Sequence, residues 1–427
     1  MDDELILVGS EKAEGLSEDD YLERKHWSLV AKSFLEHKSF MELECKSRWC
    51  KYEALLKRGL LPKNAASRER LQKYRSYCGA NDAFFRAVLS MQGFGFAPRN
   101  TSTPLPDPFR GDQPPSRFFE RCDAVLHSVM REWSAEGKVE RDESFAPLIA
   151  AIERLLPVTD VSTAYKYNVV IPGCGLGRLA AELSSRGYNT QMNEYSVFML
   201  LANNFMSNGA TQRNAFTLFP WLRTRNNLIT TADVVKGIKV PDATCAQVIS
   251  RGPYASVYRE PTKEEFAAGR LPRFSLRAGD FVELYGTPDN VGKWDGVVTC
   301  WFIDAVHDVV ELMTVIHAIL RPGGVWVNLG PLLYHWLTDQ EGTGDDRYRH
   351  SVALSWEDIR LIMDTKFPDL QFVVDEWKDA TYAARPHSMQ KMSYRSALVL
   401  QADANDIERV GNGGRNTACH TPDGRLE

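Results

Sequence analysis

A glycine-rich loop between a strand-like and a helix-like segment most constrains how this chain can fold. The stretch reads YNVVIPGCGLGRLAAELSSRG: residues 168–171 favour a strand, Gly173, Gly175 and Gly177 alternate, and 178–185 show helical spacing of Leu and Ala. Glycines let a loop turn sharply and let a ligand approach the backbone closely, and the following helix offers free N–H groups at its start. We therefore predict a strand, loop and helix that cradle a nucleotide-like ligand.

An acidic residue further along the chain supports this prediction. Glu194 follows a second strand-like segment, about where such folds place a carboxylate that hydrogen-bonds ribose hydroxyls. The loop has the form G-x-G-x-G, because Leu179 and not glycine follows Arg178. This shorter form favours S-adenosylmethionine, which has no pyrophosphate to hold, over a dinucleotide. A lone glycine triplet is more often a plain turn, but the strand, helix and acid together favour a cofactor site.

The composition argues against several other classes of protein. The chain has 427 residues, of which 44% are hydrophobic and 25% charged, so it is long enough for two or three domains with a large core. A net charge of -5 argues against a dedicated nucleic-acid binder. We find no signal peptide and no apolar run long enough to cross a membrane.

Cysteine and histidine usage completes this first description. The 8 cysteines include no C-x-x-C pair and the 9 histidines no metal-binding spacing, so we expect reduced thiols and no metal site. Reduced thiols favour a cytosolic or nuclear location. A homodimer is one of the assemblies that the sequence allows.

We predict four regions along the chain. They are a flexible leader (1–20), a helical N-terminal region (21–115), a domain that contains the glycine loop (116–400) and a disordered tail (401–427). In the third region strand-like and helix-like segments alternate, which indicates α/β architecture: a Rossmann-like, doubly wound, mostly parallel sheet. The all-α N-terminal region precedes it.

The later segments of the sheet domain have clear boundaries in the sequence. Predicted strands and helices are the strands 274–280, 294–305 and 325–331, the helices 306–320 and 355–366, and an antiparallel edge formed by 372–375 and 394–400. Ser355 is the expected N-cap of its helix, and the RPGG sequence before 325 is expected to be a turn. The sequence of residues 232–277 gives little indication of its secondary structure.

Ligands of a doubly wound sheet bind beyond the carboxyl ends of its strands, and this rule selects candidate residues. Asp280 ends one predicted strand and precedes Phe281. The carboxylate would accept a hydrogen bond from the amine of an adenine, and the ring would pack on the base. The alternative is that Asp280 caps a helix or turn.

Two further candidates follow the next strands. Asp304 ends the apolar segment TCWFID, in which Cys300 also lies, and a carboxylate there is costly unless it is paired or hydrogen-bonded. It has either a role toward the methyl acceptor or a structural role as N-cap of the helix 306–320. His335 lies just beyond the strand 325–331 among aromatic residues, where it is either functional or structural.

These residues lie in motifs that resemble the carnosine N-methyltransferase family. The matching stretches span about 116–400 and are REWSAEGKVERD, IPGCGLGRLA, GYNTQMNEYSVFML, AGDFVELY, WDGVVTCWFIDAVH, LRPGGVWVNLGPLLYH and SMQKMSYRSALVL. The NEYS, FIDA and GPLLYH pieces are more specific than the glycine loop, which all such enzymes share. The resemblance implies the fold of a class I methyltransferase that uses S-adenosylmethionine and methylates the imidazole of carnosine to give anserine.

The resemblance also implies roles for individual residues. The residues that would contact the methyl donor are Arg131, Gly173, Glu194, Asp280, Phe281 and Cys300. Those that would bind the dipeptide are Asp304, His335 and Tyr394, with Tyr382 in the same pocket. Asp304 would be catalytic: by accepting the imidazole N–H it would fix the tautomer, orient the ring and stabilise the imidazolium, as a carboxylate does in a Ser-His-Asp triad.

The sequence departs from the family pattern at a few positions. Met392 and Ser393 stand where the family tends to have aromatic residues, Ala305 replaces a small hydroxyl residue, and 232–277 diverge. A pocket with fewer aromatic residues would suit a different imidazole. Three alternatives stay open: a methyltransferase acting on histidine in a peptide or protein, an NAD-dependent oxidoreductase, and a non-catalytic scaffold.

Overall fold

The computed structural model describes residues 5–7, 18–62, 66–91, 96–98, 112–334, 351–385 and 387–403. His335, the residues after 403 and most of the predicted leader lie outside these ranges. No helix within them is long and apolar enough to cross a lipid bilayer.

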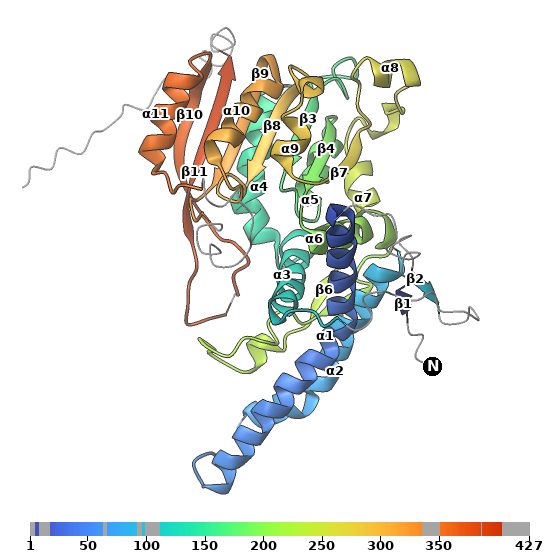
Figure 1. Cartoon of the computed structure of the whole chain (residues 1–427), viewed down its shortest axis with the longest axis vertical. Helices are drawn as coiled ribbons and strands as arrows, with labels where there is room; N and C mark the ends of the chain where they lie inside the picture. Colours follow the sequence, from blue (N-terminus) through green and yellow to red (C-terminus); the bar gives the residue numbers. More distant parts are fainter. Residues whose placement is uncertain are drawn as a thin grey trace, which may run out of the picture.

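A seven-stranded sheet forms the centre of the molecule (Figure 1). Its spatial order is β10 (Leu370–Ala380), β11 (Tyr394–Asp403), β9 (Leu320–Gly330), β8 (Trp294–Cys300), β3 (Asn168–Pro172), β4 (Asn189–Glu194) and β7 (Phe274–Ala278). The five strands from β9 to β7 pair in parallel, whereas β11 is antiparallel to both of its neighbours. The predicted α/β class and the antiparallel pair at one edge are confirmed.

The chain winds outward from β3 in both directions. It first adds β4 and β7 on one side and then returns to add β8 and β9 on the other. The order therefore reverses between β3 and β8, which is where a doubly wound sheet places its ligand. The carboxyl ends of β3, β4, β7, β8 and β9 all meet at one edge, which we call the carboxyl edge.

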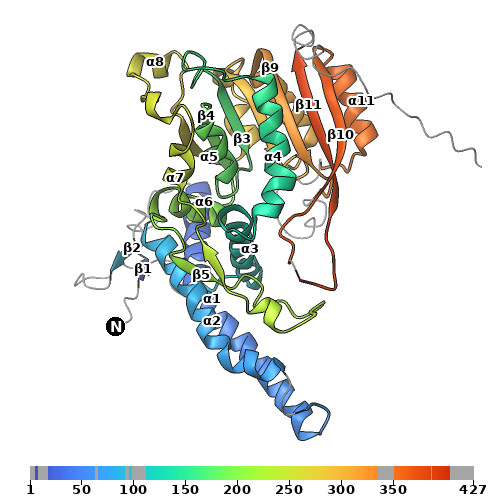
Figure 2. The ribbon, with the colours of Figure 1, turned by 180° about the vertical axis from the view of Figure 1, so that it is seen from behind.

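Helices cover both faces of the sheet, as the apolar strands require (Figures 1 and 2). One face packs against α4 (Lys138–Leu155) and α5 (Arg178–Ser185), whose apolar side chains meet those of β3, β8 and β9. The other face packs against α9 (Phe281–Tyr285), α10 (Val309–Ile319) and α11 (Trp356–Lys366). Ser355 caps α11 through a reciprocal pair of hydrogen bonds with Asp358, which confirms the predicted N-cap.

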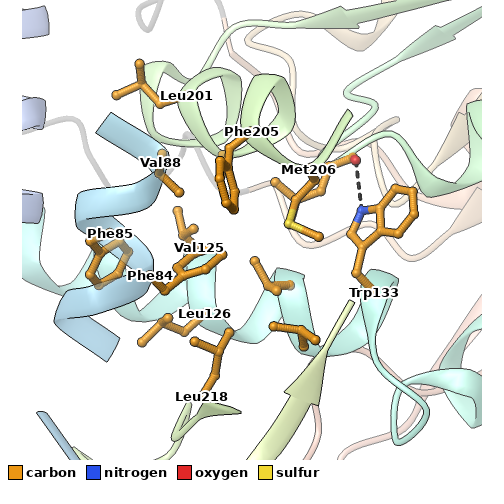
Figure 3. Packing of buried hydrophobic residues seen from close by; sticks show 14 of the residues in the cluster. Phe84, Phe85, Val88, Val125, Leu126, Trp133, Leu201, Phe205, Met206 and Leu218 are labelled. Carbon is orange, nitrogen blue, oxygen red and sulfur yellow. Dashed lines mark hydrogen bonds between the residues drawn. The ribbon is translucent and has the colours of Figure 1, made fainter. Parts of the chain in front are cut away.

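The N-terminal region is helical, as predicted. Helices α1 (Glu18–Lys57) and α2 (Ala66–Ser90) form a long hairpin that projects from the sheet domain (Figure 1). Their inner ends pack against α3 (Ser116–Trp133) and α6 (Val197–Asn204) in one hydrophobic cluster. The stacked rings of Phe34 and Phe85 belong to this cluster. Phe84 belongs to it as well and lies near Phe85 (Figure 3). The hairpin thus shares a core with α3, which leads into the site.

Shorter elements complete the described chain. Two small antiparallel sheets pair β1 (Leu5–Leu7) with β2 (Phe96–Pro98), and β5 (Phe216–Leu218) with β6 (Ile238–Val240). A π-helical turn, Phe205–Gly209, extends α6. The region 232–277, where the sequence indicated little, contributes β6, α7 (Cys245–Ser250), α8 (Lys263–Ala267) and most of β7.

Several predicted boundaries were wrong in instructive ways. The strand predicted to reach residue 305 ends at Cys300, because Trp301 has a φ of 57°, a left-handed conformation that breaks a strand. The predicted helix then begins only at Val309. The strand β7 ends two residues before Asp280. The RPGG sequence, predicted as a turn, lies within β9.

Candidate functional site

The glycine loop joins β3 to α5 as the sequence predicts, and its shape excludes larger residues. Gly173 and Gly175 have φ values of 59° and 57°, in the left-handed region. A Cβ atom at Gly173 would lie 2.2 Å from the ring of Phe302, and one at Gly175 would lie 2.7 Å from Oε1 of Glu132. There is therefore no room for a side chain at either glycine, and the backbone of the loop forms the surface that a ligand would contact.

Glu194 ends β4 next to this loop. Its buried carboxylate accepts a hydrogen bond from the N–H of Gly175 (3.1 Å) and others from the N–H groups of Tyr195 (3.0 Å) and Ser196 (2.8 Å). Burial raises the pKa of Glu194 to about 7, although the three hydrogen bonds act in the opposite direction. Glu194 thus contacts the loop directly and lies near its titration point at neutral pH.

Glu132 also holds the glycine loop, and the sequence reading missed it. Its Oε2 accepts from the backbone N–H groups of Leu176 (3.1 Å) and Arg178 (3.3 Å), while Oε1 pairs with Arg131 at 2.7 Å. The next residue, Trp133, donates its indole N–H to the carbonyl of Leu176 at 3.0 Å, the dashed line in Figure 3. The end of α3 therefore fixes the loop through two successive side chains.

A sequence signal for Glu132 did exist. An arginine and a glutamate lie side by side near the end of α3, most of whose other buried positions are apolar, and both side chains are buried. A buried charge is stable only when it is paired or hydrogen-bonded. Such a pair in an apolar helix therefore points to a structural or functional site.

Arg131 connects the loop to a group of aromatic residues. Its guanidinium carbon lies 4.4 Å from the ring centroid of Tyr382, which in turn lies 5.0 Å from the ring of Trp301. Trp301 meets Tyr394 edge-on, with 5.6 Å between the centroids. Burial alone would lower the pKa of Arg131, but Tyr382 and Glu132 raise it above its ordinary value. Arg131 therefore remains a cation between the glycine loop and the aromatic residues.

Helix α4 fastens the segment that carries Tyr382. The carboxylate of Glu140 accepts from the backbone N–H groups of Ala383 (2.7 Å) and the next residue (3.0 Å). Glu143 accepts from the N–H of Thr381 at 2.8 Å. These bonds flank Tyr382 on both sides, so its backbone is held against a helix of the sheet domain. The sequence reading assigned no role to either glutamate.

Asp304 lies in the loop after β8, four positions beyond the strand end at Cys300. Its side chain is buried, and Oδ2 accepts from the backbone N–H of Leu333 at 2.7 Å, in the segment after β9. The carboxylate thus joins two loops of the carboxyl edge. It does not cap α10, because Asp308 does so through the N–H groups of residues 310 and 311. The structural alternative for Asp304, a role as N-cap of this helix, is therefore wrong.

Asp280 has the capping role that the sequence left open. Its Oδ1 accepts from the backbone N–H groups of Val282 (2.9 Å) and Glu283 (3.2 Å) at the start of α9. Phe281 is buried and stacks on Tyr285, with 4.7 Å between the ring centroids. The loop lies beside Glu194, whose carbonyl accepts from the N–H of the residue before Asp280. Contact of Asp280 and Phe281 with an adenine stays a prediction.

The remaining sequence candidates divide into two cases. Cys300 ends β8 near Arg131, and burial raises the pKa of its thiol to about 12, so the thiol stays neutral. It can line a ligand site but is not an activated nucleophile. His335 lies outside the described residues, so its predicted role stays a prediction.

The residues at this edge fit S-adenosylmethionine. The Nε of Arg131 is buried and has no hydrogen-bond partner among the residues that the structure describes, so it is available to a carboxylate. Glu194 offers acceptor oxygens beside a loop whose backbone forms the surface. A ligand with a carboxylate, a ribose and an adenine matches these groups. This strand order, together with this loop, is the fold of class I S-adenosylmethionine-dependent methyltransferases.

Comparison with known proteins identifies the family. A family model described as carnosine N-methyltransferase matches residues 110–403. The chain belongs to the carnosine N-methyltransferase family.

Two relatives, one from an insect and one from a mammal, agree with this assignment. The carnosine N-methyltransferase unmet of Drosophila melanogaster is 31% identical over 356 residues, which cover 78% of this chain and 70% of that protein. The carnosine N-methyltransferase of Mus musculus is 35% identical over 291 residues, covering 67% and 64% respectively. A solved structure, phosphoethanolamine N-methyltransferase 2 of Haemonchus contortus with S-adenosyl-L-methionine, is 13% identical with a TM-score of 0.33, covering 66% and 47%.

Proposed function

We propose that this protein transfers a methyl group from S-adenosylmethionine to an imidazole nitrogen of carnosine, giving anserine. The observation that carries the proposal is the buried carboxylate of Asp304, in the same loop as Trp301 and at the same edge as the glycine loop. Relatives that are more than 30% identical over the aligned residues bear the name carnosine N-methyltransferase, which supports the choice of acceptor.

The donor side of the site is built by residues from β3, β4 and α3. Arg131 would bind the carboxylate of S-adenosylmethionine, Glu194 its ribose, and the backbone of Gly173 and Gly175 would pack against it. When bound, S-adenosylmethionine supplies an electrophilic methyl group on its sulfonium. The protein has to hold the acceptor nitrogen in line with that group, which is the main source of acceleration in such a transfer.

The acceptor side depends on Asp304. A neutral imidazole has one N–H and one nitrogen with a lone pair. If Asp304 accepts the N–H, the other nitrogen presents its lone pair to the methyl group. A new N–C bond forms as the donor's S–C bond breaks, and the ring becomes an imidazolium. The buried carboxylate stabilises this positive charge, and the ring then loses its N–H proton to water.

The aromatic residues complete the acceptor side. The ring of Trp301 contacts those of Tyr382 and Tyr394, and the faces of these rings carry partial negative charge. A ring that becomes cationic during the reaction is favoured next to such faces. The bonds from α4 hold Tyr382 in place, so this surface is formed before the acceptor arrives.

The direct test is to incubate the purified protein with S-adenosylmethionine and carnosine and to analyse the product by mass spectrometry. We expect a product heavier by one methyl group that co-elutes with anserine. Calorimetry with S-adenosylmethionine alone checks that the donor binds. Donor binding without methylated carnosine would overturn the proposed acceptor, and peptides with internal histidine would then be assayed. Failure to bind the donor would overturn the methyltransferase assignment itself.

A further inference from the structure

A cavity lies at the opposite edge of the sheet from the proposed methyl-transfer site. It has a volume of about 780 Å³ and is lined where β3, β8 and β9 begin, together with the segments around α8. Helix α8 lies at the end of the molecule remote from the N-terminal hairpin (Figure 1). We call this the amino edge, because the parallel strands start there.

The lining of this cavity is strongly basic. Five cationic side chains contribute to it, and the only carboxylate in the lining is that of Asp295. The cations are Lys166, Arg259, Arg270, Lys293 and Arg321. The whole chain has a net charge of -5, so the lining of the cavity differs in sign from the chain as a whole.

Internal pairing neutralises only part of this charge. Asp295 is buried, pairs with Arg321 and accepts from the backbone N–H of Asn168 at 2.7 Å, so it is held by the strand ends. Glu265 pairs with both Arg259 (2.5 Å) and Arg270 (3.0 Å).

The two lysines are the uncompensated part of the set. Lys166 and Lys293 are exposed, and neither makes an ion pair or a side-chain hydrogen bond within the described ranges. With Asp295 and Glu265 both counted, three positive charges remain without a counter-charge. Positive charge focused in a concave site attracts anions.

The chemistry of the cations and the shape of the site limit the ligand. Arginine forks bind phosphate in a bidentate manner, and lysine is a common phosphate ligand. Cavities that hold small molecules measure about 300–1,000 Å³, a range that includes this one. A nucleic acid would instead need a basic stripe across the surface, and the negative charge of the rest of the chain disfavours a long polyanion.

We propose that this cavity is a binding site for a small phosphate-bearing anion with at least two negative charges. Lys166 and Lys293 supply its main ionic contacts, and Arg321, held by Asp295, contributes its guanidinium. The site is separate from the methyl-transfer site, since its lining comes from the opposite ends of the same strands.

Pyrophosphate is the probe for the test, and calorimetry with the full-length protein is the measurement. We expect wild-type protein to bind it and the double variant Lys166→Glu/Lys293→Glu to bind at least about tenfold more weakly, because two attractions become repulsions. The matched control is Lys51→Glu/Lys57→Glu on α1, which changes the net charge equally at two exposed lysines far from the cavity. It should bind as the wild type does.

Three results would overturn the proposal. Wild-type protein that binds no pyrophosphate has no such site. If both double variants weakened pyrophosphate binding equally, the effect would come from the overall charge of the protein and not from this cavity. A tricarboxylate that binds as tightly as pyrophosphate would overturn the phosphate assignment. Melting temperatures check that the variants fold, since substitutions of exposed lysines change stability little.

Discussion

The two edges of the central sheet carry opposite charge in opposite settings. At the carboxyl edge the charged groups are mostly acidic and buried, and the protein's own N–H groups or arginines bind them, as at Glu132, Glu194 and Asp304. At the amino edge they are mostly basic, and the two lysines are exposed. One sheet thus holds a rigid, preorganised site at one end and an open, electrostatic one at the other.

This difference between buried and exposed charge explains why the two edges would position a ligand with different precision. A buried carboxylate that is hydrogen-bonded to the backbone has little freedom to move, so it can orient a reacting ring. An exposed lysine has a flexible stem, and salt readily screens its charge, so it attracts a ligand without fixing the geometry of that ligand. Substitutions at the carboxyl edge should therefore have large, specific effects on donor binding and turnover. Salt concentration should affect ligand binding more at the amino edge.

The largest expected effect is at Asp304. The Asp304→Ala variant should lose at least about 10²-fold in kcat with carnosine, because the imidazole loses the group that orients it, while donor binding persists. The control Asp308→Ala removes the cap of α10 and should cost about 1 kcal/mol of stability without loss of turnover. Steady-state kinetics and donor calorimetry measure both. Near-normal turnover of Asp304→Ala would show that the proposed mechanism is wrong.

A smaller effect is expected at the glycine loop. The Gly173→Ala variant should weaken donor binding by about tenfold, since its Cβ would displace the ring of Phe302, 2.2 Å away, and distort the loop. The control is Gly59→Ala, at a φ of 69° with nothing within 4 Å of its Cβ. It carries the same left-handed strain of about 1 kcal/mol but should leave donor binding unchanged. Equal donor affinities of the two variants would contradict close packing at the loop.

Donor binding should also depend on pH through Glu194. Its pKa of about 7 means that the carboxyl is largely protonated at pH 6 and ionised at pH 8. Only the ionised form offers all its lone pairs to ribose hydroxyls. Donor affinity should therefore rise with pH, by about tenfold between pH 6 and pH 8. Calorimetry at several pH values measures this, and Glu194→Gln should bind more weakly with no such slope. A flat wild-type profile would argue against ribose binding by Glu194.

The smallest effect separates the two edges by salt. Raising the KCl concentration from about 50 to about 500 mM should change donor affinity less than twofold, since the Arg131–Glu132 pair is buried and poorly screened. Pyrophosphate binding at the amino edge should weaken several-fold over the same range. Equal salt dependence of the two ligands would remove the contrast between buried and exposed charge.

The sequence predicted the parts of the molecule that depend on local pattern. The strand, loop and helix around Gly173, the strand that ends at Glu194 and the Ser355 cap each follow from neighbouring residues, and all are confirmed. The alternation of strands and helices likewise gave the sheet. These features need no knowledge of the rest of the chain.

The parts it missed depend on contacts between distant segments. Glu132 bonds to Leu176 and Arg178, 44 and 46 positions further along the chain, and Glu140 bonds to Ala383, 243 positions away. No periodicity in either segment indicates its partner. The end of β8 was misplaced for a related reason: the apolar run TCWFI favours a strand, but tertiary packing turns the chain at Trp301.

The β10–β11 hairpin has a consequence for how such a protein can diverge. The predicted donor-binding residues all precede β9 in the chain, whereas Tyr382 and Tyr394 lie at the two ends of the connection between β10 and β11. The last two residues of this connection, Met392 and Ser393, are exposed. That connection is anchored at its start to α4, and so can vary beyond the anchor without disturbing the glycine loop. Substitutions in this connection can thus change the predicted acceptor side of the site while leaving the predicted donor side unchanged.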